Sequence, residues 1–214
     1  MSRARRVPDV LAPGLRVLFV GINPSLQSGR VGHHFASPGN PFWRLLHAAG
    51  LTPTLLAPED DARLVEVGLG ITNVCPRPTR SAAELTPAEL REGARALEEK
   101  LATLRPEVVA LVGVSLYPIV VAGGREPGPG AKRARLCGAR LFVLPNPSGL
   151  NAAYPGFRNK LVWFHRLALT LRRAAWAPGR TDPPGAGPTA RAAGSPPPPA
   201  PRRVRRARGA RRTR

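Results

Sequence analysis

Residues 17–25 read VLFVGINPS. The first four are apolar and two of them are valine, which is typical of a buried strand that ends at Gly21. Pro24 lacks an N–H group and restricts the residue before it, so the chain turns after the strand. Asn23 is the last polar side chain before that turn. It either lines the crevice beyond the carboxyl ends of a parallel sheet, where ligands bind, or only hydrogen-bonds to its own turn, as asparagine often does.

Other apolar stretches predict the remaining strands of the same sheet. Residues 108–113 and 141–144 are typical of buried strands, and residues 70–74 predict a short strand or strand end. Residues 22–41 and 123–132 are rich in glycine and proline and predict loops. Helices are predicted between the strands from apolar periodicity, at about 42–50, 58–66, 86–104, 115–122 and 158–175.

This alternation of strands and helices indicates an α/β fold. We expect a three-layer α/β/α sandwich with a central, mainly parallel sheet of about four strands. The right-handed crossover rule brings the carboxyl ends of these strands to one edge, where their loops meet.

Composition divides the chain into an N-terminal arm (1–14), a folded domain (15–175) and a Pro/Arg-rich tail (176–214). The 214 residues include 33 Lys and Arg against 13 Asp and Glu, a net charge of +20. Such a charge favours nucleic acid as the partner, rather than a membrane, because the sequence has no long basic amphipathic helix. From residue 177 on, nine prolines and ten arginines accompany one acid, Asp182. The tail is predicted to be disordered and to bind phosphates without reading sequence, or else to be solvated and without a role.

Signatures of secreted and membrane proteins are missing from the sequence. Cys75 and Cys137 are too few for a disulfide framework or a zinc site. No secretory signal follows the N-terminal arginines, and no apolar run approaches the roughly 20 residues of a membrane span. We expect an intracellular protein, cytoplasmic and associated with the nucleoid if its source is bacterial.

The polar residues that remain point to a pocket for an extruded base. His33 and His34 are adjacent and cannot share a helical face as metal-binding histidines do, so no metal site is predicted. No phosphate-binding glycine loop is present, and Ser148 lacks the pattern of a nucleophilic serine. A pocket of asparagines, glycines, backbone amides and Phe35 suits a flipped base. An aromatic ring can stack on such a base while an amide side chain hydrogen-bonds to its edge. Alternatively, Phe35 is a core residue that closes its loop.

Six motifs then occur in a recognisable order: GINP (21–24), GHHF (32–35), PGNPFW (38–43), GITN (70–73) with Arg77 and Thr79, LREG (90–93) and NPSGL (146–150). Together they resemble the mismatch-specific uracil and thymine DNA glycosylases of the uracil-DNA glycosylase superfamily. The resemblance runs from about residue 10 to about residue 173. It implies that residues 15–175 form a DNA glycosylase domain.

The first motifs carry the residues that this family uses on the base. The resemblance implies that Asn23 is the catalytic asparagine, which positions the hydrolytic water. It implies that Phe35 stacks on the flipped base, and that the main-chain amides of Ile22 and Phe35 contact its carbonyl oxygens. Asn73 and His34 are implied to belong to the same base pocket.

The last motif carries the residues that this family uses on the duplex. The resemblance implies that Ser148 holds a phosphate and that Asn146 belongs to the same DNA-binding loop. Gly149, Leu150 and Asn151 match the segment that is inserted into the duplex, with Leu150 as the apolar wedge.

The implied activity is that of a monofunctional, monomeric DNA glycosylase with no metal or cofactor, which starts base-excision repair. Its implied partner is double-stranded DNA with a G:U or G:T mismatch. Without a carboxylate in the first motif, the rate must come from leaving-group stabilisation and water placement.

Two positions depart from the family pattern, because Ser25 replaces a glycine and Pro76 an acid. His33 and His34 resemble the thymine-acting branch of the family, whereas NPSGL (146–150) resembles the bacterial uracil-acting branch. This mixture leaves the preferred base open between uracil, thymine and modified cytosine, and hypoxanthine is a further alternative. A non-catalytic DNA-binding module is the alternative from another class.

Overall fold

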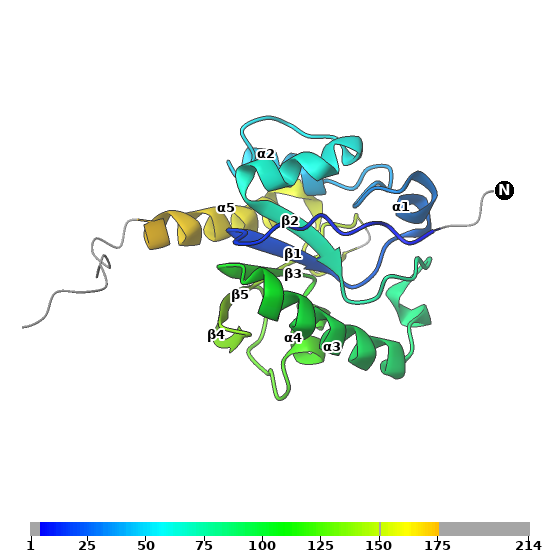
Figure 1. The fold of residues 1–214 in the computed structure, drawn as a ribbon. Coiled ribbons are helices and arrows are strands. Elements are labelled where there is room, and N and C mark those ends of the chain that lie inside the picture. Colours follow the sequence, from blue (N-terminus) through cyan, green and yellow to red (C-terminus); the bar gives the residue numbers. More distant parts are fainter. Residues whose placement is uncertain (1–4, 150, 176–214) are drawn as a thin grey trace, which may run out of the picture. The chain divides into compact units, whose positions relative to one another are not determined.

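The computed structural model describes residues 5–149 and 151–175 (Figure 1). The predicted wedge residue Leu150 and the predicted tail 176–214 lie outside these ranges. The elements in chain order are β1 (Val17–Gly21), α1 (Leu26–Val31), α2 (Phe42–Ala48), η1 (Pro58–Val67), β2 (Leu69–Asn73), η2 (Ala82–Glu84), α3 (Pro87–Leu104), β3 (Val108–Val112), η3 (Val114–Leu116), α4 (Tyr117–Val120), β4 (Gly130–Leu136), β5 (Ala139–Leu144) and α5 (Gly156–Ala175).

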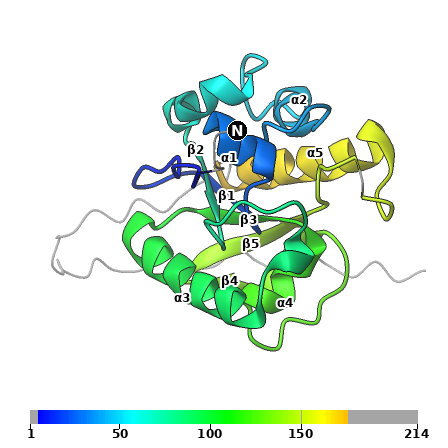
Figure 2. The same cartoon turned by 90° about the vertical axis from the view of Figure 1, so that its right-hand side faces the viewer.

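A mainly parallel sheet with helices on both faces confirms the predicted α/β class. The described ranges form five strands in the order β2-β1-β3-β5-β4, and β4 alone runs antiparallel to its neighbour. Helices α2 and α5 cover one face of the sheet, and α3 and α4 cover the other (Figures 1 and 2). In β1, Val17 and Phe19 pack with α2 and α5, while Leu18 and Val20 pack with α3 and α4. This alternation is what a strand buried on both faces requires.

Strand β4 is the fifth strand, and it begins in a segment that the sequence predicts as loop. Exposed residues, among them Arg133 and Arg135, alternate with half-buried ones along it, as expected of a sheet edge that faces solvent. Cys137 and Gly138 connect it to β5, with φ angles of 48° and 83°. Two positive φ values in a two-residue connection are the hallmark of a tight hairpin turn. A Cys-Gly pair is a weak signal for that turn, and the strand therefore escaped prediction.

The predicted loop 22–41 contains a short helix, α1. Ser25 accepts a hydrogen bond from the Ser28 N–H at 3.0 Å and so caps the helix N-terminus. Gly32 ends the helix with a φ of 83°. Serine in place of the family's glycine thus provides a cap at this position.

The described part of the N-terminal arm packs along the outer edge of the sheet. Val10 pairs antiparallel with Ile71 of β2 through two N–H···O bonds of 2.9 Å. The Lys100 ammonium lies 2.6 Å from Asp9 Oδ2 and 3.1 Å from Thr72 Oγ1, which ties the arm to α3. None of the described helices has the length and apolar character to cross a bilayer.

Candidate active site

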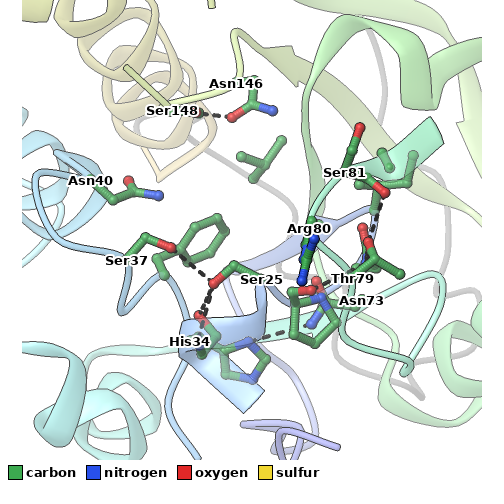
Figure 3. A pocket seen from close by; sticks show the side chains of 18 of the residues that line it. Ser25, His34, Ser37, Asn40, Asn73, Thr79, Arg80, Ser81, Asn146 and Ser148 are labelled. Carbon is green, nitrogen blue, oxygen red and sulfur yellow. Dashed lines mark hydrogen bonds between the residues drawn. The ribbon is translucent and has the colours of Figure 1, made fainter. Parts of the chain in front are cut away.

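A cavity of about 600 Å³ opens at the carboxyl ends of the strands (Figure 3). From β1 the chain passes to β2 on one side, and from β2 it returns to β3 on the other. Ligands bind beside such a reversal in open α/β sheets. The lining comes from the loop after β1, the end of β2, residues 79–82, Val112 of β3 and the loop after β5.

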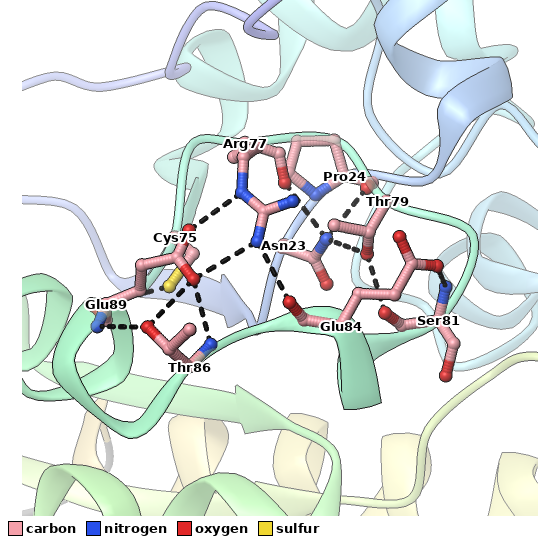
Figure 4. A network of polar contacts seen from close by, with 9 residues as sticks. All are labelled: Asn23, Pro24, Cys75, Arg77, Thr79, Ser81, Glu84, Thr86 and Glu89. Atoms are coloured by element: carbon pink, nitrogen blue, oxygen red, sulfur yellow. Dashed lines mark hydrogen bonds and ion pairs between the residues drawn. The ribbon is translucent and has the colours of Figure 1, made fainter.

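The Asn23 side chain is held in one orientation by three acceptors (Figure 4). Its Nδ2 donates to the Pro24 carbonyl at 3.1 Å, the Arg77 carbonyl at 3.0 Å and Thr79 Oγ1 at 2.6 Å. Because the Thr79 hydroxyl itself donates to the Ser81 carbonyl at 2.8 Å, it is an acceptor for Asn23. Carbonyls accept only, so the amide NH₂ must face them and Oδ1 must face away. Within the described ranges Asn23 Oδ1 has no hydrogen-bond partner, and Asn23 lines the cavity.

Phe35 forms an aromatic wall of the cavity. Its ring stacks on Phe42 with centroids 3.8 Å apart and planes 19° apart, so one ring face rests on the hydrophobic core. The half-buried ring also lines the cavity, and its stacking on a flipped base stays a prediction. Its backbone has a φ of 52°, a left-handed conformation that costs about 1–3 kcal/mol and is frequent at functional sites. The N–H groups of Phe35 and Ile22 have no hydrogen-bond partner among the described residues.

Asn73 and His34 lie together on another wall. His34 Nε2 lies 2.9 Å from the Pro8 carbonyl and must donate to it. The other ring nitrogen, Nδ1, is then an acceptor, and Asn73 Nδ2 lies 3.5 Å from it. Burial lowers the pKa of His34, which favours this neutral form. Gly21 in β1 leaves the space for the Asn73 amide, because a Cβ there would lie 2.4 Å from Asn73 Oδ1.

Asp61 approaches the histidine pair from far along the sequence. It accepts the His34 main-chain N–H at 3.1 Å, and its Oδ1 lies 3.3 Å from His33 Nδ1. The described residues nevertheless contain no group of three or more His, Cys, Asp or Glu side chains that could hold a metal ion.

The loop after β5 contributes Asn146, Ser148 and Gly149 to the lining of the cavity. Asn146 Oδ1 accepts the Ser148 N–H at 2.9 Å, and Asn151 Nδ2 donates to the Asn146 carbonyl at 2.9 Å. These bonds hold the loop in a tight turn. Asn151 supports the turn without lining the cavity.

Several lining residues were not assigned a role from the sequence. Thr79 was recognised as part of a motif, but its bond to Asn23 joins residues 56 positions apart. Arg80 is the only Arg or Lys among the described lining residues, and its guanidinium pairs with no acidic side chain in the described ranges. Ser37 and Asn40 also line the cavity, within a predicted loop. No Asp or Glu lines it in the described ranges, so no described carboxylate is placed to act as a general base.

Comparison with known proteins agrees with this architecture. The sequence model of the Uracil DNA glycosylase superfamily matches residues 8–168, which is most of the chain. The fold is similar to the solution structure of a "putative Uracil DNA glycosylase" from Methanosarcina acetivorans, with a TM-score of 0.52 and 23% sequence identity. That match covers 78% of this chain and 99% of the other. The chain therefore belongs to the uracil DNA glycosylase superfamily, a family of DNA N-glycosylases.

Proposed function

We propose that this DNA N-glycosylase flips uracil out of a mismatch with guanine and hydrolyses its bond to deoxyribose. The observation that carries the proposal is the Asn23 amide, whose NH₂ is held by three acceptors. Among the described residues, no donor reaches its Oδ1 and no carboxylate lines the cavity. Such a site is suited to placing a neutral water molecule rather than to deprotonating it.

The walls of the cavity match the chemistry of a uracil leaving group. The base stacks on Phe35, and the N–H groups of Ile22 and Phe35 are available to its carbonyl oxygens. Asn73 offers one free N–H and one carbonyl oxygen, which complement uracil O4 and N3–H. As the glycosidic bond breaks, its electron pair leaves with the base as an anion that these donors stabilise. Water held by Asn23 Oδ1 adds its oxygen to C1′, and the proton that it releases ultimately neutralises the base.

Mismatch selectivity follows from the energy of base flipping. A mispaired base costs less free energy to extrude than a correctly paired one. Without a strong general base, the chemical step is too slow to make up for the rare extrusion of a correctly paired base. The loop that carries Asn146 and Ser148 lines the cavity, and there it would meet the duplex, with Leu150 as the wedge. The basic tail would add phosphate contacts that carry no sequence information. We propose that the protein acts as a monomer.

Excision from a G:U duplex by an Asn23→Ala variant tests this proposal. We expect the variant to bind the duplex as the wild type does and to lose at least about 100-fold in single-turnover excision, because water placement is lost. Asn159→Ala is the matched control, since among the described residues the Asn159 side chain bonds only to the Pro155 carbonyl.

The same assay with uracil, thymine, hypoxanthine and modified cytosine opposite guanine separates the alternatives. If the wild type excises none of these bases, the protein is a non-catalytic DNA-binding module. Full excision by Asn23→Ala would remove Asn23 from the mechanism.

A further inference from the structure

The orientation of Asn23 depends on a segment that follows another strand. Two of its three acceptors, the Arg77 carbonyl and Thr79 Oγ1, belong to the segment after β2. We infer that the exposed Arg77–Glu89 pair, which does not line the cavity, positions Asn23 by holding this segment against the N-terminus of α3. The inference rests on the proposed catalytic role of Asn23.

The Arg77 side chain joins the segment to α3 through several bonds (Figure 4). Its Nε donates to Glu89 Oε1 at 2.7 Å, and its Nη2 donates to Glu89 Oε2 at 3.1 Å. The same Nη2 donates to the Glu84 carbonyl at 3.0 Å. Two parallel bonds to one carboxylate fix the plane of a guanidinium as well as its distance. Because the carbonyl of Arg77 accepts the Asn23 amide, fixing the side chain of Arg77 also fixes an acceptor of Asn23.

Glu89 is itself held rigidly in the first turn of α3. Its Oε2 accepts the Thr86 N–H at 2.8 Å, and the Glu89 N–H is bonded to Thr86 Oγ1 at 3.2 Å, which is a capping box. The helix lies close to the segment, since a Cβ on Gly93 would lie 2.2 Å from the Val74 carbonyl oxygen. The start of α3 is therefore a fixed support.

The carboxylate of Glu89 stays charged under assay conditions. Its bond to Arg77, followed by the bonds to Thr86, lowers its pKa from 4.5 to about 2. A lowered pKa of an acid means that the pair is fully formed above pH 4.5 and is lost only as pH falls toward 2. The pair is thus intact throughout the neutral range in which excision is measured.

Because the Arg77–Glu89 pair is exposed, its role in orienting Asn23 can be tested separately from any role in the stability of the domain. The side chains of Arg77 and Glu89 are 48% and 33% exposed. Solvent screens a pair this exposed, so even with its bidentate geometry it should contribute only a small part of the free energy of unfolding of the domain. Removing the pair should therefore leave the domain folded but free the segment after β2. The Asn23 amide then loses its fixed acceptors and can turn its NH₂ toward the water site.

The experiment compares Arg77→Met and Glu89→Gln with Arg140→Met. Glutamine keeps the helix cap while removing the charge. Arg140 lies 3.7 Å from Glu107 in another exposed pair, at the end of the sheet away from the cavity. We expect both test variants to lower kcat on a G:U duplex about ten-fold, through a displacement smaller than a full ångström, with KM unchanged. Arg140→Met should keep the wild-type kcat, and all three should melt within a few degrees of the wild type.

A double-mutant cycle with Asn23→Ala shows whether the pair acts through Asn23. 5-Fluorouracil opposite guanine, a better leaving group, makes the residual rates measurable. On the Asn23→Ala background we expect Arg77→Met and Glu89→Gln to have no further effect. Wild-type kcat in both single variants, or a full additional loss in the cycle, would overturn the inference.

Should Arg77→Met fail to fold, Glu89→Gln still decides it. The activity of Asn23→Ala alone is a separate measurement. It tests the proposed function whatever the result for the Arg77–Glu89 pair.

Discussion

The Gly21→Ala substitution places one methyl group between two walls of the cavity. An ideal Cβ on Gly21 would lie 2.4 Å from Asn73 Oδ1, 3.5 Å from its Cγ and 3.9 Å from Phe35 Cζ. Non-bonded heavy atoms are comfortable at about 3.5–4.0 Å, so the Asn73 oxygen must retreat by about 1 Å while Phe35 stays in place. The amide is a terminal group and can rotate.

That displacement should be costly for catalysis and cheap for folding. Gly21 has no positive φ, so alanine fits its backbone. Overpacking typically costs about 1–3 kcal/mol, and the domain should remain folded. The Asn73 amide, however, would leave its present position, in which Nδ2 lies 3.5 Å from His34 Nδ1. A misplacement of 1 Å in a positioning group lowers rates by about 100-fold.

Single-turnover excision of uracil from a G:U duplex measures this loss. The double variant Gly21→Ala/Asn73→Ala is the informative control, because the shorter side chain removes the collision. We expect its rate to equal that of Asn73→Ala alone. A Gly21→Ala variant with the wild-type rate would refute the assignment of Asn73 to the base-reading wall.

Two further predictions concern Phe35 and His34. Phe35→Leu should lower kcat/KM about ten-fold or more, because stacking of a base on an aromatic ring contributes about 1–3 kcal/mol; Phe35→Tyr should retain the wild-type value, and an equal loss in both variants would contradict stacking. The lowered pKa of His34 means that the unfolded chain binds a proton below pH 6.5 that the folded chain refuses, so stability should fall as pH decreases from that value. Melting temperatures from pH 7.5 to 5 should therefore decline more steeply for the wild type than for His34→Gln, and identical slopes would disprove this linkage.

Local sequence signals were strong enough to predict the interior of the fold. Strands β1 and β3 and residues 141–144 of β5 are continuous apolar runs, and the Thr86-Pro87 start of α3 combines a cap with a favourable first residue. Strand β4 was missed because its exposed edge carries cationic side chains, and only pairing with β5 makes it a strand. Helix α1 was missed because its six residues lie in a glycine-rich stretch and depend on the Ser25 cap.

The sequence by itself determined which residues are candidates, because Asn23, Phe35 and the loop around Asn146 follow strand ends or stand in ordered motifs. The direction in which these side chains point was decided only by the tertiary structure. The Asn23 amide is oriented by the Arg77 carbonyl and Thr79, 54 and 56 residues away along the chain. An amide side chain has a donor and an acceptor of nearly equal shape, so only the positions of its distant partners decide which one faces the substrate.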